Sequence, residues 1–127
     1  MRQKQRGAVT VEFALVLPLV LIIFVSAIEV THLNYVRQVA SQTAYETARR
    51  LIVPGADAAA AEQAGQDHMA NVALSQGVTV DAVIENGEVD VTVRVPVRAN
   101  SWGLGRLAPE SAAIVQACSL SREVAGL

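Results

Sequence analysis

An acidic residue stands inside a long apolar run near the start of this 127-residue chain. Glu12 is the fifth residue after Gly7, and the run from Ala8 to Ile28 holds no other ionisable side chain. A carboxylate at the centre of a membrane helix costs roughly 2.5–3.5 kcal/mol on insertion scales. Glu12 would lie only about 6 Å along a helix from Ala8, near one edge of a bilayer, where the cost is smaller. Two interpretations stay open: a carboxylate that pairs with a cation on a packed neighbouring helix, or an edge glutamate without a role.

The other residue types that carry chemistry are few and scattered. Cys118 is the only cysteine, which excludes an intrachain disulfide and a CxxC metal or redox site. His32 and His68 lie far apart in the sequence and make a poor metal site. No spacing joins a nucleophile to a base, and a net charge of −2 does not favour nucleic acid. We therefore expect no enzyme, no cofactor or metal, no nucleic acid and no small-molecule substrate.

The apolar run predicts a transmembrane helix from Ala8 to Ile28. A helix of this length spans about 31 Å, close to the hydrocarbon thickness of a bilayer. A soluble core helix that is apolar on all sides would need a larger protein around it than this chain supplies. Pro18 lies inside the run and would remove one helical hydrogen bond, so we expect a bend there.

The charges before the apolar run predict the orientation of the helix. Arg2, Lys4 and Arg6 precede it with no acid among them, and basic flanks stay in the cytoplasm. The predicted organisation is a cytoplasmic leader (1–7), a transmembrane helix (8–28), an outward helix extension (29–55) and a small extracytoplasmic domain (56–127).

A rival processing site lies at the other end of the apolar run. The small residues of Val25-Ser26-Ala27 resemble a signal peptidase I site, and cleavage there would release a soluble protein that begins at Ile28. The run is long for the apolar region of a signal peptide, and it contains Glu12 and Pro18. These features favour a retained helix.

Helical patterning continues beyond the predicted span. Glu29 to Ile52 contains no glycine or proline, and its apolar residues recur at helical spacing until Pro54-Gly55 ends the pattern. The stripe consists of Leu33, Val36, Val39 or Ala40, Ala44, Ala48 and Leu51. It can pack on the chain's own domain or on a neighbouring subunit. A second helix is predicted from Ala56 to Ser75, with Asp57 as its N-cap and Gly77 ending it.

The period then changes from helical to alternating. Valine-rich alternation between Val78 and Ala99, interrupted by Asn86-Gly87, predicts an antiparallel hairpin with a two-residue turn. Pro96 indicates an edge or a strand end. The segment from Ser111 to Val124 fits a third strand or a short helix, and we favour a strand that joins the hairpin.

The predicted fold class is therefore α+β: a long N-terminal transmembrane helix extended outward, then a small domain with one helix and a hairpin plus a third strand. Asn100 to Pro109 is expected to be a loop because it contains two glycines and ends in proline. We expect Trp102 and Leu104 to anchor this loop.

The N-terminal sequence motif resembles that of a known family. The stretch Arg6-Gly7-Ala8-Val9-Thr10-Val11-Glu12-Phe13, with Ala14-Leu15-Val16-Leu17-Pro18 behind it, is similar to the TadE-like family, the minor pseudopilins of tight-adherence (Tad/Flp) pilus systems. The resemblance implies cleavage between Gly7 and Ala8 by a prepilin peptidase on the cytoplasmic side, with the helix retained. Glu12 then takes the place of the glutamate that is the hallmark of the family.

The resemblance also implies partners and a location. It implies a protein of the bacterial inner membrane with its C-terminal domain in the periplasm. It further implies contacts with other pilins and the assembly machinery, in a role that leads to adhesion. The new N-terminus at Ala8 would carry an ammonium group that Glu12 of a neighbouring helix could neutralise. The alternative function is a signal-anchored binding module of the cell envelope that is not cleaved at Gly7.

Overall fold

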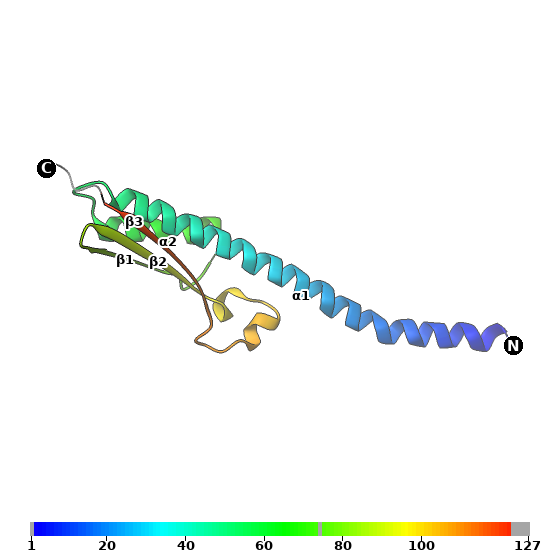
Figure 1. Ribbon diagram of the computed structural model, residues 1–127. Coiled ribbons are helices and arrows are strands. Elements are labelled where there is room, and N and C mark those ends of the chain that lie inside the picture. The colour runs from blue at the N-terminus through cyan, green and yellow to red at the C-terminus, as the bar shows by residue number, and fades with distance from the viewer. Residues whose placement is uncertain (1, 74, 123–127) are drawn as a thin grey trace.

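The computed structural model describes residues 2–73 and 75–122, with side chains from Gly7 onward. One helix, α1 (Arg2–Leu51), dominates it and contains Pro18. The helix begins at Arg2 and not at the predicted Ala8, and its helical backbone continues through Gly7 without a break. Its axis changes direction within the first third of its length, drawn in blue (Figure 1). This is the part of the helix in which the sequence predicts a bend.

The C-terminal half of α1 is the central element of the small domain. Val36, Val39, Ala40, Ala44, Ala48 and Leu51 are buried there. Of the two open possibilities for this stripe, the structure shows packing on the chain's own domain, where α1 contacts α2, β2 and β3. The helix ends at Leu51, before Pro54-Gly55, as predicted.

The second helix, α2 (Ala58–Val72), lies beside α1. Asp57 caps its N-terminus by accepting a hydrogen bond from the Ala59 amide at 3.1 Å. The helix is shorter than predicted, and the prediction that Gly77 ends it is wrong. Ala73 is the C-cap instead, and its amide donates to the Met69 carbonyl. Gly77 has a φ of +68° in the connection to the first strand.

Three antiparallel strands in the order β1-β2-β3 complete the fold: β1 (Thr79–Glu85), β2 (Glu88–Pro96) and β3 (Ala113–Ser121). Asn86 and Gly87 form the predicted hairpin turn with φ values of 51° and 79°, the positive pair that a type I′ turn needs. Pro96 closes β2, so Val97 lies outside the strand. The third strand is confirmed, although residues 123 and 124 of its predicted range lie outside the described part of the chain.

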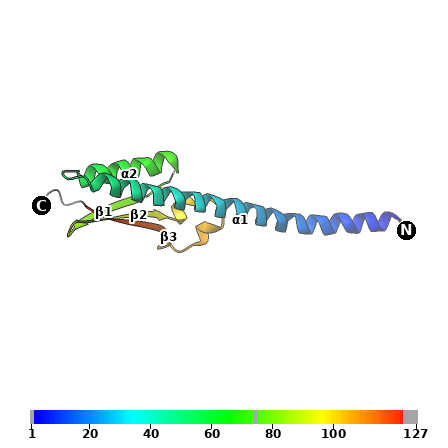
Figure 2. The same cartoon turned by 45° about the horizontal axis from the view of Figure 1, so that its top comes forward.

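The sheet has one buried face, and both helices cover it. Val89, Val91, Val93 and Val95 of the central strand are fully buried. Their cross-strand neighbours continue the layer onto both edge strands. Figure 2 shows the resulting two layers, with α1 and α2 on one side of the sheet. The predicted α+β class is therefore confirmed.

Side chains also form hydrogen bonds with the edge strand β1 and with the connections of the sheet. Glu62 of α2 accepts a hydrogen bond from the Ala82 amide of edge strand β1 at 2.8 Å. The side-chain oxygen of Asn100 accepts a hydrogen bond from the Gln76 amide at 2.6 Å. Its side-chain nitrogen donates to the Gln76 and Pro96 carbonyls, both at 2.8 Å. These contacts fix the start of the connection between β2 and β3, which contains the short 3-10 helices η1 (Arg98–Asn100) and η2 (Leu104–Leu107).

Candidate functional site

The N-terminal half of α1 stands away from the rest of the protein (Figure 1). Between Gly7 and Leu51, α1 is long and apolar enough to cross a membrane. Its most apolar 18-residue window has a mean hydropathy of 2.7, and none of that window is buried. Water is a poor solvent for such a surface, because each buried methylene is worth about 0.8 kcal/mol. By length and composition, the exposed apolar helix is therefore a candidate membrane span.

The predicted processing residues lie at the start of this helix. Gly7 and Ala8 are exposed, and a methyl group built on Gly7 would meet nothing within 4 Å. The leader positions Arg2, Lys4 and Arg6 belong to α1, but their side chains lie outside the described part of the structure. The predicted cleavage site therefore lies on helical backbone, and its cleavage stays a prediction.

Glu12 lies on the same helix segment and is exposed. It shares a shallow apolar hollow of about 260 Å³ with Val9, Phe13 and Val16, the neighbours that helical spacing brings together. The other three residues that line this hollow carry apolar side chains. A carboxylate in apolar surroundings is stabilised by a cation or hydrogen-bond donors, which these three side chains do not supply.

A comparison with protein-family models matches this part of the chain. The TadE-like family model matches residues 7–49. The TadE-like segment covers about a third of the 127 residues. It begins at Gly7, includes Glu12 and ends two residues before the end of α1. The predicted resemblance to this family is thereby confirmed over the exposed helix and its extension, while α2 and the sheet lie outside the match.

The other comparisons found nothing. No curated protein and no solved structure matches the chain. The structural account of the small domain therefore rests on its own geometry.

A second site, which the sequence analysis missed, lies where the exposed helix meets the domain. Glu29 is only 3% exposed. Its Oε1 atom accepts hydrogen bonds from the Ser101 hydroxyl, from the Gly103 amide at 3.0 Å and from the Gly105 amide at 3.3 Å. One carboxylate oxygen therefore holds the segment 101–108, which we name the junction loop, against α1.

Both glycines of the junction loop are required by this contact. A Cβ atom on Gly103 would lie 2.7 Å from Glu29 Oε2, and one on Gly105 would overlap the Ser101 hydroxyl. Within the junction loop, Arg106 Nε donates a hydrogen bond to the Ser101 carbonyl at 3.0 Å. The only sequence signal for this site is an acid directly after the apolar run, followed much later by two closely spaced glycines.

The prediction that Trp102 and Leu104 anchor this loop is wrong. Trp102 and Leu104 are 52% and 54% exposed, and Leu107 is 82% exposed. The loop is held by hydrogen bonds to Glu29, and these apolar side chains remain exposed.

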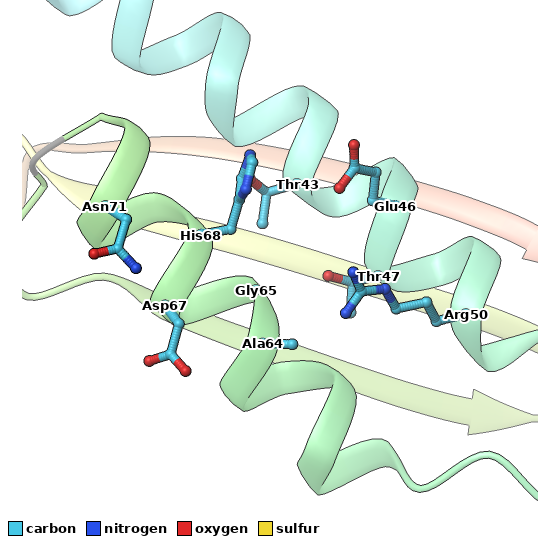
Figure 3. A pocket seen from close by; sticks show the side chains of 9 residues that line it. All are labelled: Thr43, Glu46, Thr47, Arg50, Ala64, Gly65, Asp67, His68 and Asn71. Carbon is cyan, nitrogen blue, oxygen red and sulfur yellow. The ribbon is translucent and has the colours of Figure 1, made fainter.

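A polar groove between α1 and α2 is a further candidate (Figure 3). It has a volume of about 320 Å³ and is lined by Thr43, Glu46, Thr47, Arg50, Ala64, Gly65, Asp67, His68 and Asn71. The Thr43 hydroxyl is used within α1, since it donates to the Val39 carbonyl at 2.8 Å. Among the described residues, no three His, Cys, Asp or Glu side chains gather closely enough to hold a metal ion. We assign this groove no reaction.

Proposed function

We propose that this chain is a minor pseudopilin that acts in assembly of a tight-adherence (Flp-type) pilus, and that its role is structural and not catalytic. The observation that carries the proposal is the match to the TadE-like family over residues 7–49, which include the apolar window of α1 in which no residue is buried. In this proposal the helix anchors the protein in the bacterial inner membrane. The leader faces the cytoplasm, and the sheet domain faces the periplasm.

Processing is the second part of the proposal. A prepilin peptidase would cut between Gly7 and Ala8, removing Arg2, Lys4 and Arg6 and leaving a new ammonium group on Ala8. A carboxylate and an ammonium that are both unpaired in lipid each carry a large desolvation cost, which pairing reduces. Glu12 of one subunit would therefore face the N-terminus of a neighbouring pilin. The open apolar hollow around Glu12 is compatible with a second helix packed against it.

The size of the domain supports a minor role over that of a major subunit. Major Flp pilins are much shorter, whereas α2 and the three-stranded sheet add a folded domain beyond the helix. The proposed partners are the prepilin peptidase, other pilins and pseudopilins, and the pilus assembly machinery.

The deciding experiment is mass spectrometry of the N-terminal peptide of the native protein after extraction from membranes. We expect the mature chain to begin at Ala8. The variant Gly7→Ala should retain the seven-residue leader, while the matched leader variant Gln5→Ala should be processed as the parent is. A host without the peptidase gives the reference for the uncut form.

Three outcomes would contradict this scheme. An intact Met1 in a peptidase-positive host would favour the signal-anchored binding module. A start at Ile28 would identify signal peptidase I as the processing enzyme and a soluble domain as its product. Normal processing of Gly7→Ala would remove the role given to that glycine.

The proposed pairing of Glu12 has its own test. Glu12→Ala should insert into the membrane at least as well as the parent, because a costly carboxylate is removed from the span. Assembly of the pilus should nevertheless be impaired, which electron microscopy of the cells would measure. Normal piliation of this variant would refute the link between Glu12 and a neighbouring N-terminus.

A further inference from the structure

Three large apolar side chains of the junction loop are exposed in the described structure. Trp102, Leu104 and Leu107 are each more than half exposed, and all lie within six consecutive residues. Single exposed apolar residues are common on soluble proteins, but such a cluster on one loop indicates an interaction surface.

The contact with Glu29 fixes where this loop lies along α1. Glu29 directly follows Ile28, the last residue of the apolar run. Side chains of a helix tilt toward its N-terminus, so the Glu29 carboxylate lies level with the last turn of that run. The Gly103 amide, 3.0 Å from this carboxylate, places the neighbouring Trp102 and Leu104 at the same level.

The two cartoon views agree with this placement. In both, the connection between β2 and β3 lies at the end of the domain that faces the bare half of α1 (Figures 1 and 2). The turn between β1 and β2 lies at the opposite end of the sheet. The junction loop is therefore the part of the domain nearest to a membrane that α1 would cross.

The charge of the surrounding segment fits a phospholipid surface. Residues 91–109 contain three arginines (Arg94, Arg98 and Arg106) and no acid, although Glu110 follows directly and pairs with Arg98 at 3.2 Å. Arg106 belongs to the junction loop itself and is exposed. Arginine near a bilayer is attracted to anionic headgroups, and tryptophan is enriched at the boundary between hydrocarbon and water.

We propose that the junction loop docks on the phospholipid surface at the C-terminal end of the membrane span, with Trp102, Leu104 and Leu107 in the interfacial layer. Glu29 acts as the positioning residue that keeps the loop at this depth. The loop and α1 then form two points of attachment, which fix the tilt of the domain over the membrane. This inference rests on the proposed membrane anchoring of α1.

The sequence supplies the probe for a test, because Trp102 is the only tryptophan of the chain. The full chain is reconstituted in vesicles of phosphatidylcholine and phosphatidylglycerol that contain brominated lipids. Bromine is placed either near the headgroup end of the acyl chain or near its methyl end. Emission of Trp102 should be quenched more by the shallow bromines than by the deep ones. Aqueous iodide should quench it several-fold less than it quenches a tryptophan in water.

Two variants in a Trp102→Phe background calibrate the measurement. Phe24→Trp places the probe inside the apolar run and should be quenched by the deep bromines. Val83→Trp places it on the outer face of β1, where the native side chain is 49% exposed. This position should be open to iodide and insensitive to bromine.

The outcomes separate this inference from the proposed function. If Phe24→Trp escapes every brominated lipid, the membrane anchor itself is wrong, and the docking falls with it. If Phe24→Trp is quenched while Trp102 stays open to iodide, the anchor stands and the docking of the loop is refuted. If Trp102 is shielded from iodide but insensitive to bromine, a protein surface covers the loop in place of lipid, which also overturns the proposal.

Discussion

Replacing Glu29 by alanine should release the junction loop from α1 while the sheet stays folded. Three donors converge on one oxygen of Glu29: the Ser101 hydroxyl, the Gly103 amide at 3.0 Å and the Gly105 amide at 3.3 Å. Alanine leaves all three without that acceptor. Ser101 is only 4% exposed, so water replaces the lost partner poorly at this position.

The hydrogen bonds set the size of the expected effect. A hydrogen bond to a charged group contributes about 1.5–3 kcal/mol net, and about 1.4 kcal/mol corresponds to a tenfold change in an equilibrium. Exchange of the Gly103 amide with deuterium should therefore accelerate roughly 10- to 100-fold in Glu29→Ala. The longer bond to Gly105 should give a smaller change. Glu29→Gln keeps an acceptor oxygen of similar geometry and should lie between the parent and alanine.

Hydrogen exchange of the full chain in detergent, followed residue by residue, measures these differences. The amides of Val91 and Val93 in the central strand serve as the internal control and should keep their protection. Unchanged exchange at Gly103 in Glu29→Ala would refute the role given to Glu29. Equal acceleration in the loop and in β2 would show that Glu29 stabilises the whole domain, which contradicts a local contact.

Three further predictions concern the small domain, each measured by urea unfolding of the full chain in detergent. Val91→Ala should lower the free energy of unfolding by ~2 kcal/mol, from about 0.8 kcal/mol per buried methylene plus the cavity left behind, whereas the half-exposed Val83→Ala should change it far less. Gly65→Val should destabilise by about 1–3 kcal/mol, because even a Cβ there would lie 3.0 Å from Thr47 Oγ1. Ala64→Val introduces the same side chain at the neighbouring position of α2 and serves as its control, although it lowers helix propensity whereas Gly65→Val raises it. Asp57→Ala should cost about 0.5–2 kcal/mol through loss of the N-cap, and an unchanged midpoint would refute that role.

Local pattern was sufficient for most of the elements. The apolar run, the stop at Pro54-Gly55, the N-cap at Asp57 and the turn at Asn86-Gly87 all depend on residues within a few positions of one another. Each was predicted from the sequence, and each is present in the structure. Hydrophobic periodicity and turn chemistry act over this short range, so the sequence states them directly.

Boundaries were less well determined where two local signals compete. The second helix was predicted to reach Ser75, with Gly77 ending it, because no proline and only the isolated Gly65 precede Gly77 in this segment. The structure ends it at Val72, with Ala73 as the C-cap. For the third strand, both alternating sets of side chains are partly apolar. Pairing with β2 places Ile114, Cys118 and Leu120 on the covered face of the sheet.

Contacts between distant segments were decided only by the tertiary structure. Nothing near Glu29 in the sequence indicates which groups donate hydrogen bonds to its carboxylate. The donors belong to Ser101, Gly103 and Gly105, more than seventy positions away. The sequence instead suggested Trp102 and Leu104 as anchors of that loop, because large apolar side chains are usually buried. The sequence thus determined a long apolar helix and the strands of a small sheet. Only packing of the sheet on α1 brought the junction loop to Glu29 and turned its apolar side chains outward.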